Sequence, residues 1–203
     1  MEYWHDIQIT KSWEVLKSLK GKFNFILIGG WAVYLWSRGH KSKDIDIIVD
    51  FQTLSKLKQL YDIRKNEKLR KYEIKTDEID IDVYVKHFSS LAIPPEDVKS
   101  IKIEGFDVAR LEYLLILKQE AELKRKDSEK GEKDRIDIMH ILLRCDVNFK
   151  EYIAILKSYN KKEFFARLVS IVRNFREPSH FGMNQRQFKL EKNRILEKLK
   201  EAR

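Results

Sequence analysis

Acidic residues at alternate positions of an apolar run are the part of this sequence best suited to chemistry. Asp44 and Asp46 alternate with isoleucines in the run DIDIIV, and the glycine pair Gly29-Gly30 ends an earlier apolar run, FILI. Alternate residues of an extended strand point to the same face, so the two carboxylates would lie roughly 7 Å apart along that face. Carboxylates arranged in this way can hold a hard divalent cation and, through it, the phosphates of a nucleotide.

A third carboxylate lies on a later apolar run, IDIDVYV, in which Asp80 and Asp82 share the polar face. Three carboxylates on neighbouring strands suit two-metal phosphoryl transfer, because one ion activates the attacking hydroxyl and the other neutralises the leaving pyrophosphate. We expect Asp82 to be the third ligand, since three further strand residues follow it. Asp80 is the alternative, nearer the turn. A simpler interpretation is that alternating aspartates mark the solvent face of an edge strand.

The glycine pair has two compatible interpretations. Gly29-Gly30 can make a tight turn from strand to helix, and the missing Cβ atoms also let backbone N–H groups approach a phosphate. The N-terminus of the following helix favours negative charge. We therefore expect Gly29 and Gly30 to contact a triphosphate, with Lys43, Lys41 and Arg38 as weaker candidates for neutralising it.

The order of these motifs resembles that of the DNA polymerase β-like nucleotidyltransferase superfamily over about residues 23–86, with IGGWA at 28–32, DIDI at 44–47 and DVYV at 82–85. The resemblance implies transfer of a nucleoside monophosphate from an NTP with two Mg²⁺ ions, for which Mn²⁺ can substitute. Asp44, Asp46 and Asp82 would be its catalytic and metal-binding residues. The signature has a serine in some members where this sequence has Gly30, and the glycine removes one hydroxyl contact to phosphate.

The helical part resembles the AbiEii-type nucleotidyltransferases, which are toxins of toxin–antitoxin and phage-resistance systems. The similar segments are LEYLLILK at 111–118 and KGEKDRIDI at 130–138. The resemblance implies nucleotide-binding roles for Lys118, Lys133, Asp134 and Asp137, together with a toxin-like function and an antitoxin or other protein partner. Lys118 could reach a phosphate, and Asp134 could fix its ammonium group or act as a general base. The alternative is an ordinary charged helix face.

Positive charge is concentrated near the C-terminus. Residues 1–147 contain 27 Lys and Arg against 26 Asp and Glu, whereas residues 148–203 contain 14 against 6. Phenylalanines lie among these basic residues, as stacking on bases would require. This C-terminal surplus favours an RNA acceptor, such as a tRNA 3′ end. The alternative is a solvated helical face whose phenylalanines pack between helices.

The cysteine and histidine content and the N-terminal sequence argue against disulfide-bonded, zinc-binding, secreted and membrane proteins. Cys145 is the only cysteine, so the chain can form neither an internal disulfide nor a thiolate zinc cluster, and we expect it to be a buried, inert thiol. The five histidines show no zinc spacing. The first ten residues do not resemble a signal peptide, and no apolar run approaches the length of a membrane span. We therefore expect a soluble cytoplasmic protein without a membrane partner.

Hydrophobic periodicity predicts an α+β protein whose catalytic sheet comes first and whose helical domain follows. Helices are expected at 10–19 (capped by Thr10 or Ser12), 31–38, 53–64, 111–125, 132–144, 149–159, 163–175 and 185–200. Strands are expected at 23–28, 44–49, 69–75 and 79–86, with a turn at 76–78, and a small hairpin at 101–110 turns at Glu104-Gly105. We divide the chain into a nucleotidyltransferase-type core of mixed β-sheet flanked by helices, 1–100, and an all-α domain introduced by the hairpin, 101–203.

The sequence therefore predicts a metal-dependent nucleotidyltransferase that uses an NTP and releases pyrophosphate, with RNA as the acceptor. Two alternatives stay open at this stage. The acceptor could be a small hydroxylated molecule, as in the antibiotic-modifying nucleotidyltransferases. The chain could also be a catalytically idle module on the same fold that binds nucleic acid or a protein partner.

Overall fold

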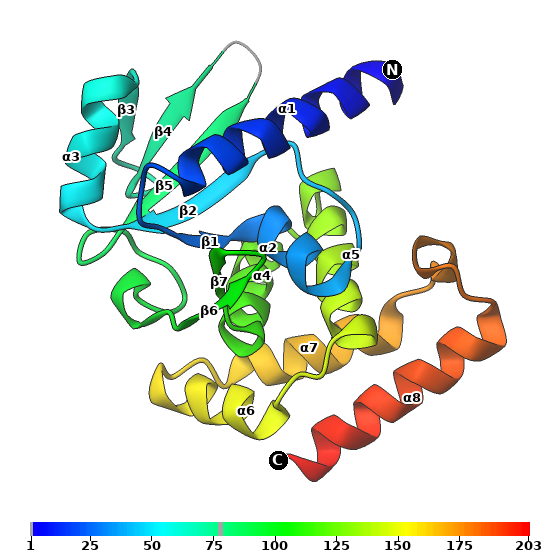
Figure 1. Ribbon diagram of the computed structural model, residues 1–203. Coiled ribbons are helices and arrows are strands. Elements are labelled where there is room, and N and C mark those ends of the chain that lie inside the picture. Colours follow the sequence, from blue (N-terminus) through cyan, green and yellow to red (C-terminus); the bar gives the residue numbers. More distant parts are fainter. Residues whose placement is uncertain (1, 77–78) are drawn as a thin grey trace. The chain divides into compact units, whose positions relative to one another are not determined.

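The computed structural model describes residues 2–76 and 79–203 (Figure 1). The chain forms two compact units, which divide after Arg110. The first unit contains α1 (Glu2–Lys20), β1 (Ile26–Ile28), α2 (Gly29–Ser37), β2 (Ile45–Val49), α3 (Phe51–Leu60), β3 (Ile63–Asn66), β4 (Lys71–Lys75), β5 (Asp80–Val85), η1 (Pro95–Asp97), β6 (Ser100–Ile103) and β7 (Phe106–Ala109). The second contains α4 (Leu111–Lys124), α5 (Glu129–Arg144), α6 (Phe149–Ser158), α7 (Glu163–Asn174), η2 (Pro178–Phe181) and α8 (Gln185–Glu201).

The first unit is built on one mixed sheet of seven strands in the order β3-β4-β5-β2-β1-β7-β6. β1 pairs with β7 and β2 pairs with β5 in parallel, and the remaining neighbours are antiparallel. β1 therefore lies inside the sheet with a partner on each side, as its nearly continuous apolar sequence predicts. The fold class expected from the sequence, a mixed sheet with helices followed by helices alone, is confirmed.

One row of register partners crosses the sheet and shows which face carries the core. Leu27 on β1 is opposite Ile47 on β2, which is opposite Val83 on β5, and all three are at most 1% exposed. The neighbouring row contains Asp46 and Asp82 and points to the other face, because successive residues of a strand alternate. The hydrophobic alternation of the sequence thus positions the carboxylates by burying their neighbours.

Helix α1 packs against the rest of the first unit through aromatic side chains. The rings of Trp13 and Trp31 have centroids 4.9 Å apart, and Trp13 also contacts Phe106 at 5.7 Å. The indole Nε1 of Trp31 donates to Ser12 Oγ at 2.8 Å, so this buried N–H has a partner. In Figure 1, α1 crosses the strands of the sheet.

Two predicted helix starts are wrong. Neither Thr10 nor Ser12 caps a helix, because α1 begins at Glu2 and the Thr10 hydroxyl donates to the carbonyl of Asp6 within it. Hydroxyl side chains tolerate this bond inside a helix, so their presence does not fix a start. Helix α3 begins at Phe51, since the Asp50 carboxylate, and not Thr53, caps it by accepting from Thr53 N at 2.7 Å.

The predicted end of this helix, α3, is also wrong. The predicted helix at 53–64 ends at Leu60, and Ile63–Asn66 forms the edge strand β3. Its sequence, IRKN, has no apolar alternation, so only pairing with β4 makes it a strand. The predicted hairpin of β4 and β5 is confirmed by their antiparallel pairing. Asp77 and Glu78, two of its three predicted turn residues, lie outside the described residues.

The hairpin at 101–110 forms as β6 and β7, but it belongs to the sheet. Glu104 and Gly105 have φ angles of 50° and 77°, as a two-residue hairpin turn with two left-handed residues requires. β7 pairs with β1, so the structure places the hairpin that we assigned to residues 101–203 in the first unit. A contact with a strand about 80 positions earlier cannot be read from local periodicity.

The second unit is entirely helical, and the five α-helices expected there agree with those observed to within three residues at each end. Asn148 caps α6 and Asn184 forms a capping box at the start of α8. Leu114, Leu115, Ile116, Ile138 and Met139 are fully buried. Among the described residues, no helix combines the length and the apolar composition that crossing a membrane would require.

Candidate functional site

The turn between β1 and α2 depends on glycine for two separate reasons. Gly29 has a φ of 68°, a left-handed conformation that L residues rarely adopt. A Cβ built on Gly29 would lie 2.0 Å from Oδ2 of Asp46, so the missing side chain is what lets this carboxylate reach the turn. Ile28, the N-cap residue of α2, has no side-chain acceptor. A carboxylate beside this helix N-terminus is electrostatically favourable.

Gly30 has a different steric requirement. A Cβ on Gly30 would lie 2.7 Å from Oγ of Ser42, and Ser42 is itself only 5% exposed. The residue after the turn is therefore small because the loop that leads into β2 passes directly against it. Both glycines are explained by packing around the Asp46 strand, and both leave the backbone at the start of α2 without covering side chains of their own.

Asp46 and Asp82 are direct partners in the parallel pairing of β2 with β5. Neighbouring strands are about 4.8 Å apart and register partners project to the same face, so the two side chains lie side by side. The same row continues across the sheet on both sides: Ile28 of β1 is opposite Asp46, and Glu73 of β4 is opposite Asp82. Asp44 lies one residue before β2 and is half-buried. The structure therefore brings Asp46 and Asp82 together, beside the glycine turn.

Asp82 also has a partner that the sequence did not reveal. Nζ of Lys71, at the start of β4, lies 2.5 Å from Oδ2 of Asp82 and 3.2 Å from Oε1 of Glu73. Lys71 is only 8% exposed, and Oε1 of Glu73 additionally accepts from Nδ2 of Asn66 at 2.9 Å. The candidate site thus contains a buried ammonium group held by two carboxylates.

Burial and neighbouring charges together shift the pKa values of Asp82 and Lys71. Burial raises the pKa of Asp82; the bond from Lys71 opposes this, while the charges of Glu73 and Asp44 add to it. Burial by itself lowers the pKa of Lys71, but its bonds to Asp82 and Glu73 outweigh burial and the net pKa is raised. Burial is thus the main cause of the raised pKa of Asp82, and the neighbouring carboxylates add to it, so the site still attracts positive charge.

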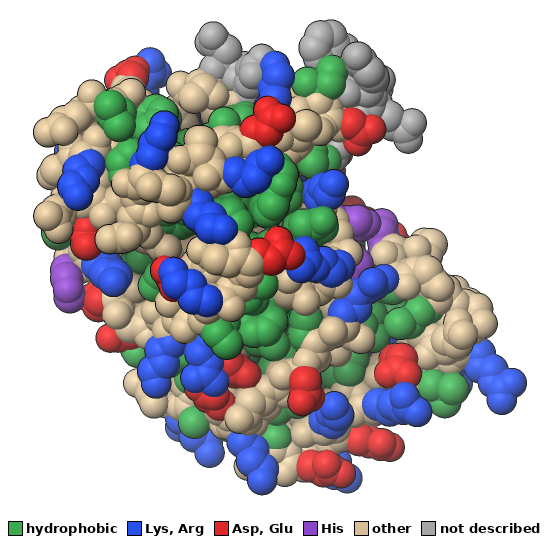
Figure 2. Space-filling model, viewed as in Figure 1, with side chains coloured by type: hydrophobic (Ala, Val, Ile, Leu, Met, Phe, Trp, Pro, Cys, Tyr) green, Lys and Arg blue, Asp and Glu red, His purple; other side chains and the backbone are tan. Residues whose placement is uncertain are grey.

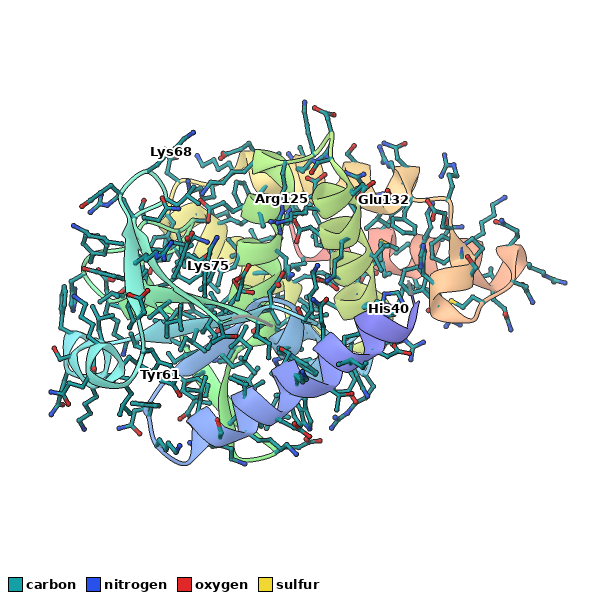
Figure 3. The ribbon with its side chains drawn as sticks, turned by 90° about the horizontal axis from the view of Figure 1, so that it is seen from above. His40, Tyr61, Lys68, Lys75, Arg125 and Glu132 are labelled. Carbon is teal, nitrogen blue, oxygen red and sulfur yellow. The ribbon has the colours of Figure 1, made fainter. Side chains whose placement is uncertain are left out.

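The remaining candidates in the first unit are placed differently. Asp80 is exposed and lies opposite Lys75, outside the row of Asp46 and Asp82; Figure 3 labels Lys75 at the end of β4. Arg38 forms an ion pair with Glu104 of the β6–β7 turn, which engages its guanidinium there. Lys41 and Lys43 are exposed, and Lys41 Nζ lies 5.9 Å from the centre of the Tyr34 ring.

The residues that could hold a divalent ion are Asp44, Asp46 and Asp82. Carboxylate oxygens are the ligands that Mg²⁺ prefers, and it commonly uses one or two of them together with waters and substrate phosphates. Asp44 and Asp46 meet that requirement, whereas Oδ2 of Asp82 contacts the Lys71 ammonium. Within the part of the chain that the structure describes, no group of three or more acidic, His or Cys side chains is already gathered as a metal site.

In the second unit, the candidates form a buried ionic cluster between α4 and α5. Nζ of Lys118 lies 2.7 Å from Oδ2 of Asp137 and 3.5 Å from Oδ1 of Asp134. Asp134 also receives two hydrogen bonds from Arg125, at 2.7 and 3.0 Å. Both aspartates are at most 2% exposed, whereas Lys133 is exposed on α5. Contact of Asp134 with the Lys118 ammonium agrees with the expectation, and Asp137 is the nearer partner.

A second buried carboxylate joins three helices of this unit. Glu122 on α4 is fully buried and forms ion pairs with Arg135 on α5 and Arg167 on α7. Its hydrogen bonds to the Glu122 carboxylate raise the pKa of Arg167. Arg125, labelled in Figure 3, follows α4 directly. Asp134 and Asp137 are therefore not part of a solvated helix face, whereas the exposed Lys133 fits that alternative interpretation.

The basic C-terminal segment contains a groove without acidic residues. It has a volume of about 400 Å³ and is lined by Arg173, Phe175, Arg176, Gln185, Phe188, Lys189, Lys192, Asn193 and Leu196. The residues from α8 recur every three or four positions and so form one helix face. Lys192 donates to the carbonyls of Arg173 and Phe175 at the end of α7, at 2.9 and 2.8 Å. Burial, and then Arg176, lowers the pKa of Lys192.

The described lining of the groove contains only basic charged residues, unlike the mixed charges elsewhere on the chain. On the face shown in Figure 2, Lys and Arg side chains alternate with Asp and Glu. A neighbouring pocket of about 550 Å³ is also mixed, because Asp127, Glu132 and Glu177 line it together with arginines. Phe175 and Phe188 of the groove are buried and pack against each other, so these phenylalanines serve the helical core.

Solved structures similar to the chain include nucleotidyltransferase-like proteins. An antigenic nucleotidyltransferase-like protein from Paracoccidioides brasiliensis is 14% identical over 88% of this chain and 98% of its own, with a TM-score of 0.44. JHP933 from Helicobacter pylori is 18% identical over 96% and 94%, with a TM-score of 0.49. The Megavirus polyadenylate synthase is 15% identical over 75% of this chain and 37% of its own, with a TM-score of 0.46.

No family model matches the chain, and no curated protein has a significantly similar sequence. At such low identities and TM-scores, the function has to be inferred from the residues of this chain.

Proposed function

We propose that the chain is a nucleotidyltransferase that moves a nucleoside monophosphate from an NTP to a hydroxyl of RNA and releases pyrophosphate. The observation that carries this proposal is the position of Asp46, which lies against the glycine turn before α2 and beside Asp82 on the next strand. A triphosphate at the turn would meet backbone N–H groups, the α2 N-terminus and a carboxylate-bound cation at once. The proposal includes a cytoplasmic location, because the cytoplasm supplies NTPs.

The proposal assigns Mg²⁺, or Mn²⁺ in its place, to Asp44 and Asp46 together with the NTP phosphates, and Asp82 to the acceptor side. The ion supplies charge neutralisation of the triphosphate and activation of the acceptor hydroxyl. Gly29 and Gly30 keep the phosphate path open, and Lys43 is an exposed cation available to the substrate. Nucleotide contacts by Lys118, Lys133, Asp134 and Asp137 remain a prediction from the AbiEii resemblance.

Binding of a metal–nucleotide complex tests the assignment directly. Titration of Mn²⁺ with a non-hydrolysable NTP analogue should show saturable binding to the wild-type chain and its loss in Asp46→Asn. The matched control is Asp80→Asn, because Asp80 is exposed on the same strand as Asp82 and outside its row. Equal metal-dependent binding by wild type and Asp46→Asn would contradict the proposal.

An RNA acceptor is supported by the groove between α7 and α8. Arg173, Arg176, Lys189 and Lys192 present four cations to it, and the described lining contains no Asp or Glu. A concave strip of positive charge without carboxylates in its lining is the kind of surface that tracks a phosphodiester backbone, whereas a small hydroxylated acceptor needs no such strip. A toxin-like role with an antitoxin partner is the part of the proposal that rests on the AbiEii resemblance alone.

RNA binding at the groove predicts a defined salt dependence. Each phosphate contact on a single strand contributes about −0.7 to the slope of log K against log salt, so Arg173→Gln with Lys189→Gln should flatten the slope by about 1.4. Lys198→Gln is the matched control, because Lys198 is an exposed α8 lysine outside the groove lining. An unchanged slope in the double variant would favour a small-molecule acceptor.

A further inference from the structure

Lys71 contacts the carboxylate that a two-metal site would need for its second cation. Its ammonium group contacts Oδ2 of Asp82 at 2.5 Å, and Asp82 is the carboxylate expected to hold the catalytic ion. Lys71 is 11% exposed in its side chain and Asp82 is 28% exposed, so the pair lies largely out of solvent. An ion bound by Asp82 in the same place would bring a divalent charge next to a buried ammonium group, which is strongly unfavourable.

The surroundings of Lys71 hold it in this position. Glu73 contacts the same ammonium at 3.2 Å and is itself fixed by the amide of Asn66 on β3. Tyr72 opposite Val83 and Glu73 opposite Asp82 set the register of β4 against β5, so the β4 backbone directs the polar face of the strand toward Asp82. A buried lysine that loses one of two carboxylate partners incurs a large desolvation cost, which opposes its displacement by a metal ion.

We propose that the Lys71 ammonium takes the place of one of the two divalent ions, so that the site binds a single ion through Asp44, Asp46 and the NTP. Lys71 is then a positioning residue that keeps Asp82 ionised and oriented without a metal. The inference rests on the proposed function, since it concerns the same site. It replaces the two ions that the superfamily resemblance implies by one.

The number of bound Mn²⁺ ions tests this inference without any turnover. Loss of the free Mn²⁺ paramagnetic resonance signal should give about one ion per chain in the wild type saturated with a non-hydrolysable NTP analogue, against about two for a two-metal site. Lys71→Met removes the charge and keeps most of the volume, and it should raise the count to about two, because Asp82 then needs a new cation. Lys71→Arg keeps the charge and should leave the count unchanged.

Lys75→Met is the matched control, because Lys75 lies on the same strand but is exposed and opposite Asp80. A count of two in the wild type, or the same single ion in wild type and folded Lys71→Met, would overturn the inference and leave the proposed function intact. Absence of any Mn²⁺ binding to the wild-type chain with the analogue would overturn both. Circular dichroism establishes that each variant is folded, and the wild-type count decides the question even if Lys71→Met does not fold.

Discussion

Replacement of Gly29 by alanine should destabilise the protein far more than the addition of one methyl group suggests. The new Cβ would lie 2.0 Å from Oδ2 and 2.6 Å from Cγ of Asp46, and Gly29 has a φ of 68°. The left-handed backbone costs a non-glycine residue about 1–2 kcal/mol. Forcing Asp46 aside adds about 1–3 kcal/mol, the usual cost of overpacking. We expect the free energy of unfolding to fall by about 2–5 kcal/mol in total. Metal–nucleotide binding should also be lost, because Asp46 moves.

Gly182→Ala separates these two contributions. Gly182 has a similar φ of 64°, but a Cβ there would have no heavy atom within 4 Å. The Gly182→Ala substitution should therefore lower the free energy of unfolding only by the backbone contribution of about 1–2 kcal/mol. Urea unfolding followed by circular dichroism reports on both units, whereas all four tryptophans lie between Trp4 and Trp36 and fluorescence would follow the first unit alone. Equal destabilisation by the two substitutions, with nucleotide binding retained in Gly29→Ala, would refute the steric explanation.

Three further outcomes follow from the ionisable groups. The hydrogen bond from Thr53 N lowers the pKa of Asp50 below its ordinary value of 3.8, so its cap contributes above that pH and is lost on acidification. Asp50→Asn should remove this pH dependence of urea unfolding, at a cost below about 1 kcal/mol at neutral pH because the site is exposed. Cys145 is only half-buried, and not buried as expected from the sequence, but burial still raises its pKa to about 11. Alkylation by iodoacetamide at pH 8 should therefore be slower in the folded chain than in urea, and equal rates would contradict this protection. Glu122→Gln should destabilise the second unit by about 3 kcal/mol in urea unfolding, because two arginines lose their buried partner, whereas Glu120→Gln, in an i,i+4 pair whose lysine is exposed and whose glutamate is half-buried, should cost less than about 1 kcal/mol.

Local patterns in the sequence were sufficient for most of the elements and for the aspartate strands. Alternation of isoleucine with aspartate fixes both the strand and the face of Asp46, because burying Ile45 and Ile47 leaves the aspartate on the other side. The glycine pair was expected to make the turn, and it does. Its proximity to Asp46 could not be derived, since it depends on how β2 pairs with β1.

Lys71 shows why part of the site was missed. Its contact with Asp82 depends on the register of β4 against β5, and a slip of one residue would move Lys71 to the opposite face. Register across a turn of uncertain length is not encoded in periodicity. The signal available in the sequence was weak: Lys71 and Glu73 alternate with Tyr72 and Ile74, which identifies a polar face without its partner.

The helical candidates were reached only through the resemblance. Periodicity identifies α4 and α5 but does not show that Lys118, Asp134 and Asp137 are buried together, because charged residues are normally assigned to solvent. Pairing of opposite charges across two helices is what makes their burial tolerable.

Transfer of label from α-³²P-labelled NTPs to total cellular RNA, in the presence of Mn²⁺ or Mg²⁺, tests the central claim most directly. The wild-type chain and Asp80→Asn should transfer label from at least one NTP, and Asp46→Asn and Asp82→Asn should not, although all three variants remain folded by circular dichroism. Equal transfer by wild type and Asp46→Asn, or no transfer from any NTP by the wild-type chain that binds the metal–nucleotide complex, would contradict the assignment of Asp46 and Asp82 as the centre of a nucleotidyltransferase site acting on RNA.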